Sequence, residues 1–205
     1  MKKGLVSAAV SLAACGGIAL ATAPAALAAA NGGVCQLTGQ ANFASPGLTV
    51  NSSPFTYNFS GTLTNCHSGT TAGLNGGPTG GTIQTIGPGT FNATGSGGCV
   101  SSTTSGVALV TWNDNDTTVV KYTTTGALAA VVQQGSVIAS YQYQTGTDPT
   151  TGQPIYATYT TNEPATPVGD SAGGLLTFNP GSPTACNTGV TSAAINGAIA
   201  TGASS

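Results

Sequence analysis

The chain has 205 residues, of which 40% are hydrophobic and only 4% are charged, and its formal net charge is −2. Nucleic-acid binding depends on clustered lysine and arginine, and this chain has three such residues against five acidic ones, so the composition excludes a nucleic-acid partner. The same shortage argues against attachment to anionic lipid by a basic patch.

The first segment, residues 1–28, has the features of a secretory signal peptide. Lys2 and Lys3 precede an apolar stretch, which ends in the small-residue motif Ala-Leu-Ala at 26–28. We therefore predict export, cleavage near Ala28 and one mature domain over residues 29–205. The apolar stretch is too short and too interrupted for a transmembrane segment, and we predict none.

Cys15 raises an alternative to release. The stretch Leu-Ala-Ala-Cys at 12–15 has the form of a lipobox, and cleavage there would anchor the protein through an acylated Cys15. Against anchoring, the chain stays apolar up to Ala30, whereas a tethered lipoprotein normally continues with a polar linker. Without Cys15 an even number of cysteines remains. We favour a secreted protein, with the lipoprotein as the alternative.

The remaining cysteines predict a disulfide framework rather than a metal site. They are Cys35, Cys66, Cys99 and Cys186. None lies in a C-x-x-C motif and the chain has one histidine, so zinc spacing is missing. Four cysteines allow three pairings. We expect Cys35–Cys66, because strands near the start of the domain would lie side by side, and Cys99–Cys186, because Cys186 precedes the last strand.

The rest of the chain is rich in Thr, Val, Gly, Ser and Tyr, with turn residues at short intervals, which indicates strands. In chain order we predict strands or strand pairs at 56–63, 81–95, 105–124, 136–144, 155–161, 173–179 and 190–202. Residues 126–132 (GALAAVV) are hydrophobic on both faces and predict a central strand. Residues 67–81 and 162–174 are predicted to be surface loops. The pattern predicts an all-β fold, an antiparallel β-sandwich or barrel of Ig-like or Greek-key type.

Residues 112–118 (WNDNDTT) hold the oxygen ligands that Ca²⁺ prefers, from Asp114 and Asp116 with their flanking asparagines. An EF-hand loop also needs a glycine and a distal glutamate, and both are missing. Asn and Asp are also common in tight turns. We therefore predict a hairpin turn here, and no metal site.

No catalytic arrangement stands out. A Ser-His-Asp triad would need His67, which follows Cys66 into a glycine-rich loop. Asp148, Glu163 and Asp170 would be the acids of a glycosidase, but all three lie in Pro/Gly-rich sequence where solvated carboxylates are the rule. We predict that the protein is not an enzyme and has no cofactor, with an envelope-active hydrolase as the third alternative.

Four tyrosines crowd one predicted hairpin: Tyr141, Tyr143, Tyr156 and Tyr159. Exposed tyrosines can stack on sugar rings, whereas a cross-strand aromatic ladder would only stabilise the sheet. We favour the ladder, and the cluster is also the best candidate for a binding surface.

Several segments resemble a group of small secreted actinobacterial proteins of unassigned function. They are a start with Cys35, Gly39, Phe43, Pro46, Gly47 and Leu48, a strand that ends at Cys66, the Thr-Trp-Asn hairpin at 111–113, and a cysteine near the C-terminus. The resemblance implies export, disulfides and a β-sandwich, and no catalytic residues. We predict a structural or interaction protein of the cell surface or extracellular space, with a cell-surface glycan or protein as the candidate partner. The alternative is a small-ligand or glycan-binding module.

Overall fold

The computed structural model describes residues 32–202, apart from 51–52, 128 and 183. The predicted signal peptide and Cys15 lie outside the described residues. The elements in chain order are β1 (Gly33–Phe43), β2 (Phe55–Ser68), β3 (Thr71–Ala72), a 3₁₀ turn η2 (Leu74–Gly76), β4 (Gly81–Ile86), β5 (Ala93–Gly97), β6 (Ser101–Trp112), β7 (Thr117–Ala127), β8 (Ala130–Ile138), β9 (Ser140–Thr147), β10 (Pro154–Thr160), β11 (Ser171–Asn179), α1 (Ala185–Thr188) and β12 (Ser192–Gly202). The all-β prediction is confirmed.

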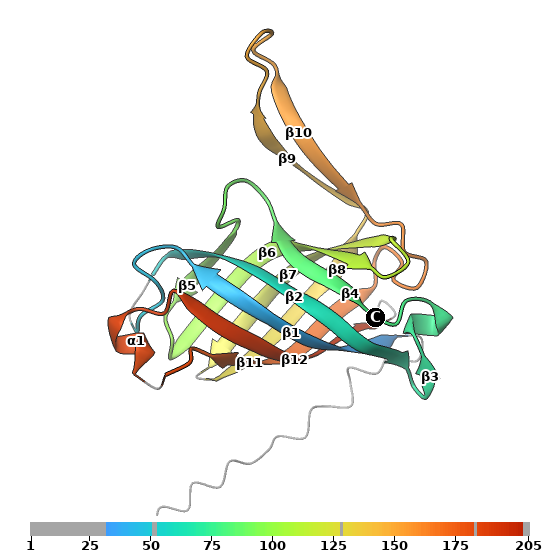
Figure 1. Cartoon of the computed structure of the whole chain (residues 1–205), viewed down its shortest axis with the longest axis horizontal. Helices are drawn as coiled ribbons and strands as arrows, with labels where there is room; N and C mark the ends of the chain where they lie inside the picture. The colour runs from blue at the N-terminus through green and yellow to red at the C-terminus, as the bar shows by residue number, and fades with distance from the viewer. Residues whose placement is uncertain (1–31, 51–52, 128, 183, 203–205) are drawn as a thin grey trace, which may run out of the picture.

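The main sheet closes on itself as an antiparallel barrel of eight strand positions (Figure 1). Closure follows from β1, which pairs with β12 on one side and with β2 on the other. β4 and β5 share one position, because each pairs with both β2 and β6. They therefore act as one strand interrupted by residues 87–92, which lie within the segment 81–95 that was predicted to form a strand or strand pair.

The connectivity is simpler than the Greek-key or Ig-like type that the sequence suggested. Strands that follow one another along the chain are also neighbours in the barrel, so the topology is an up-and-down meander. Of the predicted sandwich and barrel, the barrel is the form adopted. A closed barrel leaves no unpaired sheet edge, which suits a chain with few charged residues to protect an edge.

One strand prediction is wrong. Residues 126–132 were expected to form a central strand, but the chain turns there between Ala127 and Ala130, which pair with each other across β7 and β8. Ala127, Ala129 and Ala130 are exposed, and of the described residues in this run Val131 packs against the core from within the barrel.

A two-stranded hairpin, β9 with β10, leaves the barrel between β8 and β11 and projects away from it (Figure 1). The predicted strand 136–144 is thus divided at Ala139. Its first part belongs to the barrel and its second part to the hairpin. At this division the Ala139 carbonyl accepts a hydrogen bond from the Thr161 N–H, which holds the two legs of the hairpin together at their base.

Both expected disulfides form, Cys35–Cys66 and Cys99–Cys186. The first joins β1 to β2 at one end of the barrel, and the second joins the β5–β6 turn to α1 at the other end. Disulfides persist in oxidising compartments, so the pair indicates an extracellular or other oxidising location. Among the described residues, no helix is long and apolar enough to cross a membrane.

Candidate binding site inside the barrel

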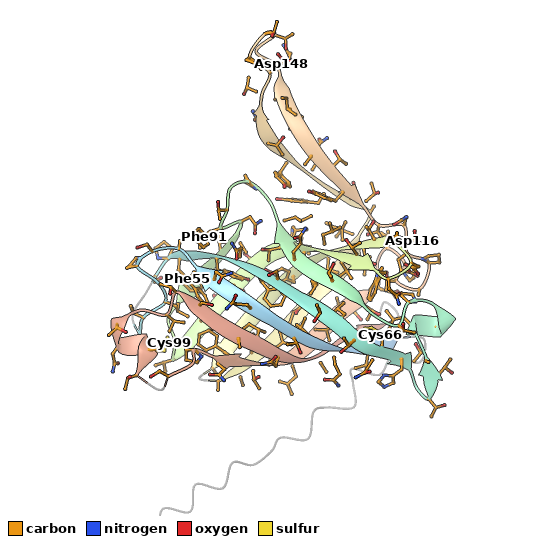
Figure 2. All side chains as sticks on the ribbon, in the orientation of Figure 1. Phe55, Cys66, Phe91, Cys99, Asp116 and Asp148 are labelled. Carbon is orange, nitrogen blue, oxygen red and sulfur yellow. A yellow bond between two sulfur atoms is a disulfide. The ribbon has the colours of Figure 1, made fainter. Side chains whose placement is uncertain are left out.

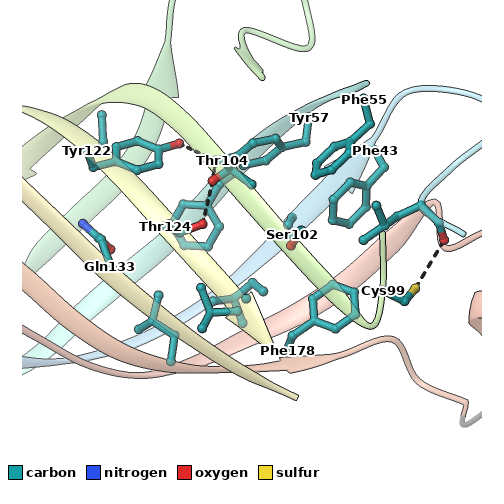
Figure 3. Close-up of a pocket in the computed structure, with 18 of the residues that line it drawn as sticks. Phe43, Phe55, Tyr57, Cys99, Ser102, Thr104, Tyr122, Thr124, Gln133 and Phe178 are labelled. Carbon is teal, nitrogen blue, oxygen red and sulfur yellow. Dashed lines mark hydrogen bonds between the residues drawn. The ribbon is translucent and has the colours of Figure 1, made fainter. Parts of the chain in front are cut away.

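The barrel interior is packed at one end and hollow toward the other. Side chains alternate along each strand, so every second residue points inward. At the packed end Leu63, Leu74 and Trp112 fill the interior, each at most 4% exposed. Toward the other end the inward residues enclose a cavity of about 100 Å³ (Figure 3). Barrels of eight strands are just wide enough to be filled by side chains or to hold one small ligand.

Aromatic rings form one wall of this cavity. The Phe43 ring lies at the centre, with its centroid 5.9 Å from Phe55, 6.0 Å from Tyr57 and 6.2 Å from Phe178. These residues come from β1, β2 and β11, three strands that closure of the barrel brings together. Edge-to-face and tilted arrangements of this kind are favourable for aromatic rings. The wall offers a ligand an apolar surface with fixed shape.

Beside the phenylalanine rings, and starting from the Tyr57 hydroxyl, four hydroxyl groups form a continuous hydrogen-bonded chain. The Tyr57 hydroxyl lies 2.8 Å from the Tyr122 hydroxyl and 2.9 Å from that of Thr104. The Thr104 hydroxyl lies 2.7 Å from the Thr124 hydroxyl. Four hydroxyls carry four protons, and three mutual bonds use three of them. The fourth O–H is therefore left without an acceptor among these four hydroxyls and can donate to a bound molecule.

Tyr57 and Tyr122, the two tyrosines in the chain of hydroxyls, stay neutral at physiological pH. Burial raises the pKa of Tyr57 above its ordinary value, although its hydrogen bonds to Thr104 and Tyr122 act in the opposite direction. Burial also raises the pKa of Tyr122 well above its ordinary value, and the neighbouring Tyr57 adds to the shift. The chain thus presents neutral donors and acceptors rather than a general base or an anion.

Two further polar side chains line the cavity, Ser102 and Gln133. Within the part of the chain that the structure describes, neither side chain has a hydrogen-bond partner. Gly126 lies between their strands and also lines the cavity. A Cβ atom there would lie 2.9 Å from the Ser102 Oγ, so the absence of a side chain keeps this part of the interior open.

Residues 44–50, which follow β1, lie at the barrel end nearest the cavity, and we call this segment the cover. It is hydrogen-bonded to both cysteines of the second disulfide: the Thr49 carbonyl accepts the Cys99 N–H at 2.9 Å, and the Val50 N–H donates to the Cys186 carbonyl at 3.2 Å. Leu48 exchanges two 2.8 Å backbone hydrogen bonds with Val190. The Cys99–Cys186 disulfide therefore holds the cover in place, and both Leu48 and Cys99 line the cavity.

The four tyrosines predicted as a binding surface lie on two different faces of the β9–β10 hairpin. Tyr141, Tyr143 and Tyr159 share one face and pack on the outer barrel wall against Ile86, Leu109 and Val119. Their rings form the expected ladder, with centroids 5.8 Å apart for Tyr141–Tyr143 and 6.2 Å apart for Tyr143–Tyr159. Tyr156 lies on the opposite face and is 51% exposed.

The other candidate residues lie apart from the cavity. His67 is exposed, and its Nδ1 lies 2.9 Å from the Asn65 carbonyl oxygen. Asp148 lies at the tip of the hairpin, far from the barrel (Figure 2), where N–H groups of Thr150 and Thr151 bind its carboxylate and lower its pKa. Burial raises the pKa of Asp170, which immediately precedes β11. None of these residues lines the cavity.

No family model matches this chain, and no curated protein or solved structure is significantly similar to it. The resemblance to small secreted actinobacterial proteins stays a prediction. The function is therefore argued from the geometry alone.

Proposed function

We propose that the protein is a non-enzymatic carrier or receptor that holds a small, largely apolar molecule inside its barrel. The observation that carries the proposal is the half-filled interior, in which an aromatic wall faces a chain of hydroxyls with one spare donor. Binding pockets are typically apolar with a few placed polar groups, and this cavity has that character.

The size of the cavity defines the class of ligand. This cavity is about 100 Å³, smaller than the apolar cavity of about 150 Å³ that accommodates benzene. A short branched chain fits it as it stands, whereas a single ring, or the end of a longer molecule, enters by partly displacing the segment that covers the cavity. A hydroxyl or carbonyl on that ligand would meet the spare hydroxyl proton, Ser102 or Gln133.

The cavity chemistry supports binding over catalysis. Among the described residues that line it, none is a carboxylate, a histidine or a lysine. Its two ionisable groups are tyrosines with raised pKa values. A hydrolase would need a nucleophile with a base, or two carboxylates, next to the substrate.

Phenol and benzene are matched probes for this site, because they differ by the one hydroxyl that the polar chain would bind. Isothermal titration of the purified protein should give saturable binding of both, at about 10⁻⁴–10⁻³ M, with phenol the tighter by about tenfold. Equal affinities for phenol and benzene would show that the hydroxyl chain does not contact the ligand. Absence of saturable binding of either probe would overturn the proposal.

Gly126→Val is the variant that tests the location. Its side chain would enter the cavity and meet the movable Ser102 hydroxyl first, so it should abolish binding of both probes while the barrel still folds. Gly146→Val is the matched control, because a Cβ atom at Gly146 on the hairpin has nothing within 4 Å. Unchanged binding in the Gly126 variant would place the probes elsewhere.

A surface interaction role is the second candidate, and the hairpin favours it. The β9–β10 hairpin projects from the barrel and exposes Ile155 (49%) and Tyr156 (51%) side by side in the sequence. Exposed apolar residues on a projecting element suit contact with a protein or glycan. A double variant, Ile155→Ser with Tyr156→Ser, should reduce binding to the producing cell's own surface material and leave phenol binding unchanged. Equal binding of the variant and the parent protein to that material would remove the hairpin from this role.

A further inference from the structure

Three carboxylates converge at the packed end of the barrel, away from the cavity. Asp114 and Asp116 belong to the β6–β7 turn, and Glu163 comes from the loop after β10. One carboxylate oxygen of each residue lies within 4.8 Å of the corresponding atoms of the other two. Figure 2 marks the place by its Asp116 label. The sequence pattern predicted the turn that holds the two aspartates, but it did not predict that Glu163 lies beside them.

Backbone and side-chain hydrogen bonds fix the loop of Glu163 against the turn. The N–H groups of Asn162 and Glu163 both donate to the Thr117 carbonyl, at 2.9 and 3.2 Å. In return the Asn162 Oδ1 accepts from the Thr117 N–H at 2.7 Å. The Asn162 amide also donates to Asp116 at 2.7 Å. The approach of the three acids is thus built into the fold rather than left to mobile side chains.

Glu163 is buried with an oxygen that lacks a partner. The residue is 4% exposed. Its Oε1 accepts the Ala165 N–H at 2.7 Å. Its Oε2 is buried and has no hydrogen-bond partner among the described residues. Burying an unsatisfied carboxylate oxygen is costly, so a native structure that keeps one normally supplies a proton or a cation.

Protein cations do not compensate these charges. Lys121 is the only Lys or Arg among the described residues, and it faces outward from the middle of β7 between Val107 and Ser136. The three carboxyl groups therefore converge on one small volume with no lysine or arginine of the described residues beside them, an arrangement that suits a bound positive ion.

We propose that Asp114, Asp116 and Glu163 form a binding site for Ca²⁺. Calcium binds carboxylate oxygens at 2.3–2.6 Å, so two ligands on opposite sides of one ion lie about 4.8 Å apart. The three oxygens lie within 4.8 Å of one another, a spacing at which small side-chain adjustments would bring all of them onto one ion. Calcium also accepts irregular ligand geometry, whereas Mg²⁺ requires a near-octahedral one. The ligands come from two separate segments, so the site ties the β6–β7 turn to the loop after β10.

Terbium luminescence tests this directly, because Trp112 is the chain's single tryptophan and flanks the site. The backbone N–H of Trp112 donates to the Asp116 carbonyl at 2.9 Å, and its indole N–H donates to the Thr118 hydroxyl at 2.8 Å, so the ring lies close enough to the turn to sensitise a bound Tb³⁺ ion. After EDTA treatment, Tb³⁺ alone should give saturable emission that Ca²⁺ displaces at about 10⁻⁴–10⁻³ M. Glu163→Gln and Asp114→Asn should each weaken Tb³⁺ binding at least tenfold. Asp148→Asn, at the hairpin tip, is the matched control and should bind as the parent protein does.

Thermal unfolding separates a metal site from a simple turn. With Ca²⁺ at about a hundred times its Kd, the melting temperature of the parent protein should rise by about 5–10 °C over that in EDTA. Glu163→Gln should lose this rise. In EDTA it should melt at or above the parent protein, because it removes a buried unpaired charge. No Ca²⁺-dependent rise, or Tb³⁺ emission that both acid variants retain, would show that the carboxylates only shape the turn.

Discussion

The hydroxyl oxygens of Tyr57 and Tyr122 lie 2.8 Å apart inside the barrel, although the residues are 65 positions apart in the chain. This contact joins β2 to β7 across the interior and begins the chain of hydroxyls that continues through Thr104 to Thr124. The hydroxyl chain therefore links strands across the barrel interior and also offers a ligand a polar surface.

Tyr57→Phe should break this chain between Tyr122 and Thr104. The change leaves the hydroxyls of Tyr122 and Thr104 without their common partner, so the free energy of unfolding should fall by about 1–3 kcal/mol. Urea unfolding measures the loss, and the affinity of phenol should approach that of benzene. Tyr156→Phe, on the exposed hairpin face, should be neutral in both assays. A neutral Tyr57→Phe would show that the hydroxyl chain contributes little.

Stability should decline in alkaline solution because of the same two tyrosines. Their pKa values are raised in the folded protein, so the folded state holds these protons more tightly than the unfolded state does. Their contribution is fully present below the unfolded tyrosine pKa of about 10 and is lost as the pH rises toward the folded values. Urea unfolding between about pH 8 and pH 11 should show the decline. A double variant, Tyr57→Phe with Tyr122→Phe, should show a shallower decline, and an equal slope would contradict this assignment.

Removal of the Cys99–Cys186 disulfide should affect both stability and access to the cavity. It closes a loop with a sequence separation of 87, against 31 for Cys35–Cys66. Chain entropy then gives losses of about 4–5 and 3–4 kcal/mol for the paired Cys→Ser variants. Because the longer bridge also holds the cover, its removal should speed phenol exchange, measured by NMR line shape. Equal phenol exchange rates in the two variants would show that the cover does not control entry of the ligand.

The tyrosine ladder should stabilise the hairpin rather than bind ligand. Tyr143 touches two neighbouring rings and packs on the barrel wall, so Tyr143→Ala should cost about 1–2 kcal/mol and raise hydrogen exchange in β9 and β10. Tyr156→Ala, on the open face, should change the free energy of unfolding by less than about 0.5 kcal/mol. A larger loss of unfolding free energy for Tyr156→Ala than for Tyr143→Ala would show that the stabilising contacts lie on the exposed face of the hairpin.

The sequence was informative wherever local pattern determines structure. The local pattern of residues 56–63 predicted a strand where β2 forms, and the cysteines indicated both bridges. The same pattern is compatible with a sandwich and a barrel, because closure depends on the pairing of the first strand with the last. That contact is non-local, and no short motif encodes it.

The cavity and the acidic cluster could not be predicted for a related reason. Thr104 and Thr124 look like ordinary strand threonines until barrel closure turns them toward Tyr57. Glu163 looks like a solvated loop residue until Thr117 binds its loop. One signal was available: small or polar residues at inward positions of β6 and β7, among them Ser102 and Gly126, leave volume that a packed core would fill.

The measurement that tests the central claim most directly is an NMR titration of the methyl-labelled protein with phenol. Ile83 and Ile195 line the cavity, whereas Ile155 is exposed on the hairpin. The account predicts saturable shifts at Ile83 and Ile195, with phenol–methyl cross-relaxation at both and no change at Ile155. Shifts confined to Ile155, or no saturable shift at any methyl group, would contradict a ligand site inside the barrel.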